Sequence, residues 1–351
     1  MRFALAPLAG FTDAPFRRMC FEGGADVCYT EMVSAAGLAH GSSPTRHLLA
    51  TMPGEGPLAV QLFGSTEGDL AAASRIVDEA VVREGCGRAV ELNLNAGCPM
   101  AKVVRTGSGA RLAEDPGRIY RLLVAMSENT GLPVTLKTRL GPRPGDDRIF
   151  EILDAAERAG AKGIVVHARY TSQLHGGAVH LDVLSNVVRR ARIPVVGNGS
   201  VVDRESAAAM AATGVGAIMV GRAALARPGI FGELKAAFGI QTEDGGEPGA
   251  KWGDGPFWAH LGYLLEFRRM LAEQYPGDHV PDEDAFASVK MRTHLFRYFG
   301  GRPGAAALRA RLNSVRTLSE LRALVPAPSV PGAGELCYNI GMKTTSRGVG
   351  E

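Results

Sequence analysis

The chain has 351 residues and a mass of 37.0 kDa, with 46% hydrophobic and 21% charged residues. This length suits one large domain with a small one, or two ordinary domains, and the near-average composition excludes a wholly disordered, collagen-like or small disulfide-scaffold protein. The formal net charge is only +3, but the stretch from Ala285 to Val325 holds eight basic residues and one acidic residue. That stretch carries +7 and leaves −4 for the rest, so we expect an acidic body with a basic C-terminal end.

Short apolar or β-branched runs alternate with helical patterns through the first two thirds of the chain. The predicted strands are Phe3–Pro7, Val27–Met32, Leu58–Phe63, Ala89–Leu94, Val134–Thr138, Gly163–His167, Pro194–Asn198 and Ala217–Val220. The clearest predicted helices between them are Asp69–Arg83, Gly117–Asn129, Ile149–Ala159, Asp182–Arg190 and Asp203–Ala212. This alternation indicates parallel strands joined by crossover helices.

Eight such units match the size of a (β/α)8 TIM barrel. An open doubly wound sheet is the competing architecture, but the first strand is followed by Pro7-Leu8-Ala9-Gly10 and not by a G-x-G-x-x-G turn. We therefore predict an α/β protein in which residues 1–238 form the barrel.

A stretch rich in Gly and Pro, 239–256, is predicted to be a linker. Three helices of a small bundle are expected after it, at Phe257–Tyr275, Ala285–Tyr298 and Pro303–Leu324, so that residues 257–325 form a second, helical domain. The remaining residues, 326–351, have the composition of a disordered tail.

Cysteine usage and the N-terminus bear on location. The five cysteines have no C-x-x-C spacing, which argues against a disulfide framework and a zinc site, so no metal is expected. Residues Met1–Pro7 are too short for a signal peptide, and the apolar run Ala207–Val220 is broken by Gly and Thr. A cytoplasmic protein without membrane association is expected, and the sequence points to no obligate protein partner.

In a barrel, the reacting groups come from the C-terminal ends of the strands and from the loops that follow. The predicted strand ends carry Pro7, Gln61, Asn95 with Cys98, Lys137 with Arg139, His167, Asn198 with Gly199, and Gly221 with Arg222. Each alone has an ordinary interpretation; Gln61 or Asn198 could equally be a satisfied loop amide. A buried lysine such as Lys137 is uncommon unless it is paired or functional.

The last two strand ends have the composition of a phosphate site. Asn198-Gly199-Ser200 and Gly221-Arg222 combine exposed backbone N–H groups with a cation, where barrels commonly hold a phosphate; two ordinary tight turns are the alternative. Cys98 lies between Gly97 and Pro99 at the active end of the barrel, where a thiol can be a nucleophile or a proton donor. The other cysteines are expected to be inert.

Together these segments resemble the tRNA-dihydrouridine synthases, a family of FMN-dependent reductases. The resemblance covers nearly the whole chain and rests on Ala6-Pro7-Leu8-Ala9-Gly10-Phe11-Thr12-Asp13, Phe16-Arg17, Thr30-Glu31-Met32, Val60-Gln61-Leu62-Phe63-Gly64, Asn95-Ala96-Gly97-Cys98-Pro99, Lys102 with Gly109 and Leu112, Leu136-Lys137-Thr138-Arg139-Leu140-Gly141, Val166-His167-Ala168-Arg169, Asn198-Gly199 and Val220-Gly221-Arg222. Departures from the family pattern are Asn93, where Asp is usual, Val104, His175 and Ser200. The change at His175 concerns base recognition more than catalysis.

The resemblance implies a role for each matching residue. Gln61, Lys137 and His167 would contact the flavin ring, the last two near its N1–C2 edge, and Pro7 would pack nearby. Asn198, Gly199, Gly221 and Arg222 would hold the phosphate of FMN. Hydride would pass from flavin N5 to C6 of a uridine, and Cys98 would protonate C5. Asn95 and Arg139 would grip the base, Lys102 would meet RNA, and NADPH would reduce the flavin.

The basic end independently suits a polyanion such as tRNA. Lys290 and Arg297, like Arg309 and Arg316, are seven residues apart, which keeps each pair on one face of a helix. Such a face can capture phosphates, although a merely solvated helix face has the same composition.

Three other functions remain open from the sequence. An FMN-dependent barrel reductase of a free pyrimidine or an enoate would share the flavin residues but would not need the basic end. A class I aldolase would use Lys137 as its Schiff-base amine but would leave Cys98 and Gln61 unexplained. A catalytically inactive tRNA-binding relative would not need Cys98.

Overall fold

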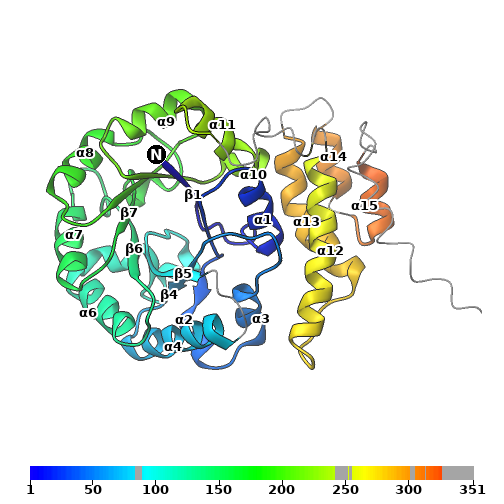
Figure 1. Cartoon of the computed structure of the whole chain (residues 1–351), viewed down its shortest axis with the longest axis horizontal. Coiled ribbons are helices and arrows are strands. Elements are labelled where there is room, and N and C mark those ends of the chain that lie inside the picture. The colour runs from blue at the N-terminus through cyan, green and yellow to red at the C-terminus, as the bar shows by residue number, and fades with distance from the viewer. Residues whose placement is uncertain (84–88, 242–251, 253–254, 301–304, 313, 326–351) are drawn as a thin grey trace, which may run out of the picture.

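The computed structural model describes residues 1–83, 89–241, 252, 255–300, 305–312 and 314–325. Its strands are β1 (Arg2–Leu5), β2 (Val27–Tyr29), β3 (Val33–Ser34), β4 (Leu58–Phe63), β5 (Ala89–Ala96), β6 (Val134–Arg139), β7 (Ile164–His167), β8 (Val195–Asn198) and β9 (Ala217–Val220). All pairings are parallel, in the order β2-β1-β9-β8-β7-β6-β5-β4, and the pairing of β2 with β4 closes the barrel (Figure 1). The predicted (β/α)8 barrel is confirmed; the sequence missed only the short β3, which pairs with β4.

Helices surround the barrel as the pattern predicted. They are α1 (Ala14–Glu22), α2 (Ala35–Ala39), α3 (Ser43–Arg46), α4 (Glu67–Arg83), α5 (Ala101–Val104), α6 (Pro116–Ser127), α7 (Ile149–Arg158), α8 (Leu181–Arg190), α9 (Arg204–Ala211), α10 (Ala223–Ala226) and α11 (Ile230–Ala237). Side-chain caps mark several starts: Asp13 accepts the N–H of Phe16 at α1, and Asp203 accepts that of Ser206 at α9. None of the described helices is long and apolar enough to cross a membrane.

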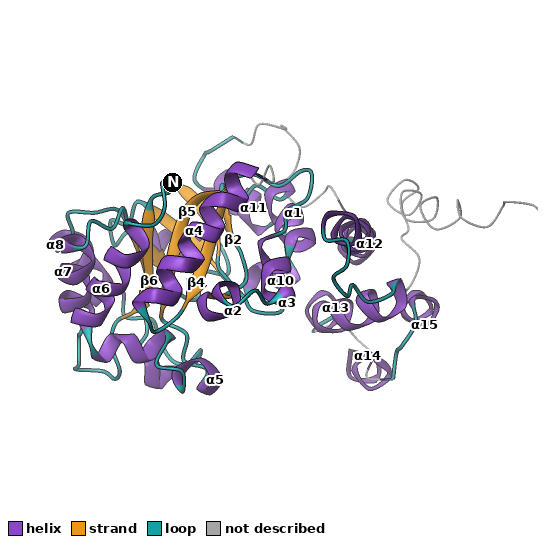
Figure 2. Cartoon of the chain, turned by 90° about the horizontal axis from the view of Figure 1, so that it is seen from below, coloured by secondary structure: helices purple, strands orange, loops and turns teal. Residues whose placement is uncertain are grey.

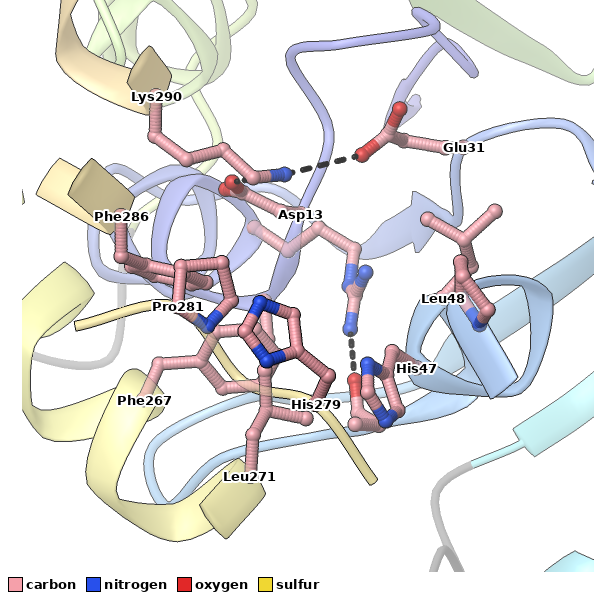
Figure 3. A pocket seen from close by; sticks show the side chains of 14 residues that line it. Asp13, Glu31, His47, Leu48, Phe267, Leu271, His279, Pro281, Phe286 and Lys290 are labelled. Carbon is pink, nitrogen blue, oxygen red and sulfur yellow. Dashed lines mark hydrogen bonds and ion pairs between the residues drawn. The ribbon is translucent and has the colours of Figure 1, made fainter. Parts of the chain in front are cut away.

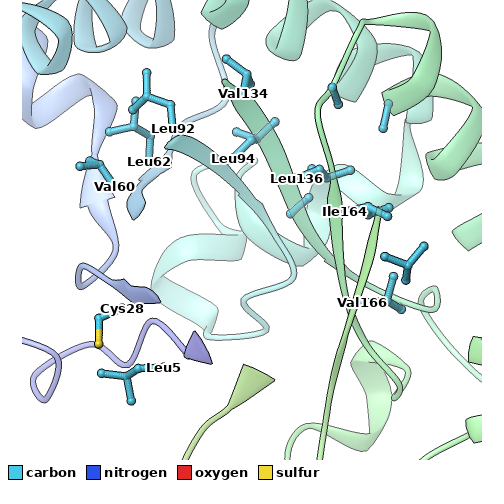
Figure 4. Packing of buried hydrophobic residues seen from close by; sticks show 14 of the residues in the cluster. Leu5, Cys28, Val60, Leu62, Leu92, Leu94, Val134, Leu136, Ile164 and Val166 are labelled. Atoms are coloured by element: carbon cyan, nitrogen blue, oxygen red, sulfur yellow. The ribbon is translucent and has the colours of Figure 1, made fainter. Parts of the chain in front are cut away.

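The strands bury apolar side chains on their outer face and more varied ones inside the barrel. Leu62, Leu92 and Leu94 belong to the main core between strands and helices (Figure 4). The interior holds a separate cluster of mostly small residues that includes Ala4, Ala59 and Met219. Because side chains alternate along a strand, the residues between the outward leucines of β5 face the interior, and these are polar.

In the described part of the chain, the helices that stand beside the barrel (Figures 1 and 2) are α12 (Pro256–Gln274), α13 (Glu283–Tyr298), α14 (Ala305–Leu312) and α15 (Leu318–Leu324). The single helix predicted for Pro303–Leu324 is wrong, because the chain turns between α14 and α15. Thr317 caps α15 by accepting the N–H of Glu320, which starts a new helix there. Most of the predicted linker 239–256 and all of the predicted tail 326–351 lie outside the described residues.

The contact between barrel and helices combines apolar packing with charge. Ala50 and Met52 of the barrel belong to the same buried cluster as the apolar faces of α12 and α13. Nζ of Lys290 on α13 lies 3.3 Å from Oδ2 of Asp13 and 3.8 Å from Oε1 of Glu31 (Figure 3). These groups line one end of a cavity of about 340 Å³ between the barrel and the helices.

Two buried histidines lie against Asp13 in the same contact. Possible ligand atoms of Asp13, His260 and His294 lie within 4.8 Å of one another. The Asp13 carboxylate is already engaged, since Oδ1 accepts the N–H of Phe16 and Oδ2 faces Lys290. Two imidazoles remain, fewer ligands than a zinc site requires, and we assign the group to the contact between barrel and helices.

Acid should weaken this contact. Burial lowers the pKa of His260 from 6.5 to about 4 and also lowers that of His294, so the unfolded chain takes up protons below pH 6.5 that the native chain does not. The free energy of unfolding should therefore fall by about 1.4 kcal/mol per pH unit for each histidine as the pH drops from about 6.5 towards 4. Urea unfolding between pH 7.5 and 5 measures this slope.

The His294→Gln variant should show a flatter slope than the native chain. The matched control is His40→Gln, because the His40 side chain is 79% exposed and should leave the slope unchanged. Equal slopes for His294→Gln and the native chain would contradict the assignment.

Candidate active site

The predicted site residues gather at one end of the barrel. Asn95 pairs with Lys137 between β5 and β6, and Arg139, His167 and Asn198 are level with one another on β6, β7 and β8. Pro7 follows β1, Cys98 follows β5, and Gly221 and Arg222 follow β9. This is the end at which the strands terminate, as expected for a barrel active site.

Hydrogen bonds hold Cys98 in a fixed turn. Oδ1 of Asn95 accepts the N–H groups of Gly97 at 3.2 Å and Cys98 at 3.0 Å. The carbonyl of Cys98 accepts the N–H of Ala110 at 2.9 Å, so the following segment folds back on the turn. Gly109 permits this approach: its φ is +61°, and a Cβ there would lie 2.6 Å from the carbonyl oxygen of Cys98.

The surroundings keep the Cys98 thiol protonated. Burial raises its pKa above the usual value, and this effect exceeds the opposing influence of the Met100 N–H, Arg139 and Lys137. A protonated thiol at neutral pH can donate a proton, whereas a nucleophilic cysteine needs a lowered pKa. Of the two roles that the sequence left open, these surroundings favour proton donation.

Lys137 extends into the barrel mouth from β6. Its Nζ donates to Oδ1 of Asn198 at 3.2 Å, and Nδ2 of Asn198 donates to the carbonyl of Met219 at 2.9 Å. Burial, and next the neighbouring Arg139, lowers the pKa of Lys137 to about 7. Among the described residues no carboxylate pairs with this half-buried side chain, although a lysine withdrawn from solvent normally has such a partner.

Cationic side chains surround His167. Burial and then the charges of Lys137, Arg139 and Arg169 lower the pKa of His167 far below its usual range, so the ring is neutral. Nη1 of Arg169 lies 3.2 Å from Nε2 of His167, and Nη2 of Arg222 donates to the carbonyl of His175 at 3.1 Å. In the described part of the chain, Lys137, Arg139, Arg169 and Arg222 have no carboxylate partner. Such a cluster is suited to an anionic ligand.

The loops after β8 and β9 can accept a phosphate beside this cluster. Gly199 has a φ of +128°, and a Cβ there would lie 3.0 Å from both His167 and Val179, so only glycine fits without displacement. Nη2 of Arg169 donates to Oγ of Ser200 at 2.6 Å, which places the guanidinium against the same loop. Arg169 was not among the predicted site residues, although it lies two positions after His167 in the quoted motif.

Two predicted contacts with the target base have other partners in the structure. All four hydrogen-bonding positions of the Asn95 amide are used, because besides its two acceptor bonds it donates to Oε1 of Gln61 at 2.7 Å and to Sδ of Met32 at 3.1 Å. Arg139 is buried and donates to the carbonyls of Gly97 at 2.8 Å and Tyr170 at 3.2 Å. Both residues therefore support the turn of Cys98, and contact with a base stays a prediction.

Gln61 also lies beneath the site and not on its surface. Its exposed fraction is 0%, and its amide bonds to Asn93 and Asn95. A direct contact between Gln61 and a flavin ring stays a prediction that its burial does not favour.

The predicted RNA-binding residues differ in how far they are open to solvent. Lys102 is exposed on α5, next to the turn of Cys98. Lys290 is not on an open face, because it pairs with Asp13 and Glu31. The guanidinium of Arg297 on the same helix lies 5.9 Å from the ring centroid of Phe11, beside a recess of about 300 Å³ at the barrel rim.

Arg309 and Arg316 do not share one helix face. Arg309 belongs to α14, and its side chain is outside the described part; Arg316 is exposed between α14 and α15. The spacing argument is therefore wrong for this pair, because the helix on which it depended is broken.

Comparisons with known proteins identify the family of the chain. Residues 4–329 match the family described as dihydrouridine synthase. A tRNA-dihydrouridine synthase B of Klebsiella pneumoniae is 35% identical over 235 residues, which cover 67% of this chain and 71% of that protein. A probable tRNA-dihydrouridine synthase of Mycobacterium tuberculosis is 32% identical over 338 residues, covering 92% of this chain and 80% of the relative. The chain belongs to the dihydrouridine synthase family.

Proposed function

We propose that this protein reduces a uridine of tRNA, in the D-loop, to 5,6-dihydrouridine, with FMN as cofactor and NADPH as reductant. The observation that carries the proposal is the cluster of Lys137, Arg139, Arg169 and Arg222 around a neutral His167, without a carboxylate partner in the described residues. A phosphate-bearing flavin would supply the negative charge that this cluster lacks.

The residues present suit FMN. The backbone at Gly199 and Gly221, with Arg169 and Arg222 alongside, would hold the phosphate, and Lys137 and His167 would face the ring. FMN bound there and reduced by NADPH would supply a hydride for C6 of the uridine. Asn198 orients Lys137 through its 3.2 Å hydrogen bond, which keeps the ammonium in the barrel mouth.

Cys98 would supply the proton at C5 of the uridine. Its thiol is protonated at neutral pH, and the bonds from Asn95 and Ala110 fix the turn that carries it. A donor held in one place is the condition for general acid catalysis. In the segment that follows, Lys102, Arg105 and Arg111 are exposed and would meet RNA.

The proposal is tested by the bound cofactor. Purified protein should be yellow and should release FMN on denaturation. A colourless preparation that also fails to take up added FMN would exclude the flavin chemistry.

Reversing the charge of Arg297 should weaken tRNA binding. Arg297 is exposed at the junction of α13 with the barrel rim, close to the loop after β1, so an RNA whose base enters the barrel would pass near it. Arg297→Glu should raise the Kd for tRNA and reduce the steepness of its dependence on salt by about one phosphate contact. Filter binding of unmodified tRNA at several salt concentrations measures both quantities.

The matched control is Arg189→Glu, an exposed arginine at the last turn of α8, at the other end of the barrel. It should leave tRNA binding unchanged. Equal losses for the two variants would indicate a general charge effect and not a docking site at the junction.

A further inference from the structure

A chain of hydrogen-bonded side chains runs through the barrel from its base to the turn of Cys98. The lower bonds are Thr135 Oγ1 to Glu91 Oε1 at 3.1 Å, Asn93 Nδ2 to Thr135 Oγ1 at 2.7 Å, and Gln61 Nε2 to Asn93 Oδ1 at 2.7 Å. The upper bonds are Asn95 Nδ2 to Gln61 Oε1 at 2.7 Å and the Cys98 N–H to Asn95 Oδ1 at 3.0 Å. Tyr29 Oη also donates to Oε1 of Glu91.

Strand register explains the path of this chain. Glu91, Asn93 and Asn95 are alternate residues of β5, so all three face the barrel interior. Asn93 is level with Gln61 on β4 and with Thr135 on β6, which places the amides and the hydroxyl side by side. Gln61, Asn93, Asn95 and Thr135 are each at most 6% exposed, so water does not compete for their hydrogen bonds.

The two ends of the chain determine its direction. At the top, the N–H groups of Gly97 and Cys98 can only donate, so Asn95 must present its oxygen to them and its nitrogen to Gln61. At the bottom, two hydroxyls converge on Oε1 of Glu91, which must accept. Every amide between these ends has one orientation that satisfies both neighbours.

We propose that Glu91 is a positioning residue, which acts through Thr135, Asn93 and Gln61 to hold Asn95 and the turn of Cys98 in one orientation. Without Glu91, the buried Thr135 hydroxyl keeps only the 3.5 Å bond to the carbonyl of Leu92 as a donor. The amides above it then lose their firm support at the base, while the N–H groups at the top still select their orientation. A buried amide whose hydrogen-bond partner is poorly held is costly. The loss of Glu91 should therefore weaken the bonds that Asn95 accepts from Gly97 and Cys98.

The proposed effect of Glu91 depends on Asn93. An asparagine both accepts from Gln61 and donates to Thr135, and so passes the direction on. An aspartate at this position would accept from both neighbours, and the chain would end there. The Asn93→Asp variant should therefore hold the turn of Cys98 without help from Glu91.

This proposal rests on the proposed function only in assuming that the turn of Cys98 serves catalysis. The main measurement is therefore one that does not require the protein to be enzymatically active. Amide hydrogen exchange of the peptide Asn95–Met100 reports on the N–H groups of Gly97 and Cys98. In Glu91→Leu they should exchange about tenfold faster than in the native chain, because their acceptor is no longer held. In Glu91→Gln, which keeps an acceptor oxygen, exchange should stay within about twofold.

Three comparisons separate the loss of these hydrogen bonds from general damage to the fold. Tyr29→Phe removes the other donor to Glu91 and should leave hydrogen exchange at Cys98 unchanged. Exchange of the β8 peptide Val195–Asn198 should be unchanged in every variant. In an Asn93→Asp background, Glu91→Leu should have no further effect. Should Glu91→Leu fail to fold, Glu91→Gln, Asn93→Asp and Thr135→Val provide the same comparison, with faster exchange expected only for Thr135→Val.

Turnover provides the second measurement. Glu91→Leu should lower kcat for dihydrouridine formation and leave KM for tRNA unchanged, with recovery in Glu91→Gln. Equal exchange in Glu91→Leu and the native chain, or an undiminished effect in the Asn93→Asp background, would overturn the proposal. A native protein that makes no dihydrouridine but shows the predicted exchange would instead contradict the proposed function alone.

Discussion

Cys98→Ala should lower the rate of uridine reduction about 10²- to 10⁴-fold, the usual contribution of a positioned general acid. The Cys98 thiol is protonated because burial raises its pKa, and the turn that carries it is held by Asn95 and Ala110. The variant keeps Lys137, Arg169 and the phosphate loops, so it should retain FMN and bind tRNA. Dihydrouridine formed in a single turnover measures the loss.

The matched control is Cys28→Ala on β2, which also removes a protonated thiol, but one that is fully buried in the core behind the barrel wall. It should retain bound FMN and the rate of reduction. A Cys98→Ala variant that reduces uridine at the native rate would remove Cys98 from the chemistry and leave it only a structural role.

Lys137→Met should remove most of the bound flavin and lower turnover about 10²-fold or more, as expected when a preorganised electrostatic contact is lost. Lys137 is the half-buried lysine of the cation cluster, and methionine keeps most of its volume while removing the amine and its bond to Asn198. Flavin content per chain, from absorbance after gel filtration, measures the first effect, and dihydrouridine formation with added FMN measures the second.

Lys162→Met is the control for Lys137→Met. Lys162 is an exposed lysine just before β7, at the end of the barrel away from the site. It should leave flavin content and turnover unchanged. Full flavin content together with full activity in Lys137→Met would contradict the assignment of the cation cluster to the cofactor.

The barrel could be predicted because parallel strands with crossover helices leave a repeating pattern in the sequence. The strand ends could be predicted for the same reason, since closing the barrel brings Asn95, Lys137, His167 and Asn198 to one end. The break between α14 and α15 was missed although Thr317 and Glu320 have the spacing of a capping box, because the basic and apolar residues continue through it.

The partner of each side chain could not be predicted, because it depends on packing in three dimensions. Lys290 was expected on an RNA-binding face, but the docking of α13 brings it to Asp13 and Glu31. Gln61 was expected at the flavin, but its strand register places its amide between Asn93 and Asn95. Arg169 completes the cation cluster because its guanidinium reaches Ser200 across the β7 and β8 ends.

The most direct test of the proposed function is dihydrouridine formation by the purified protein. Unmodified tRNA, NADPH and the flavin-loaded protein are incubated, and nuclease fragments of the tRNA are analysed by mass spectrometry. The proposed function predicts a fragment from the D-loop that gains two hydrogen atoms at a uridine, with the gain dependent on both NADPH and Cys98. Unchanged uridine in tRNA that the flavin-loaded protein binds would contradict it.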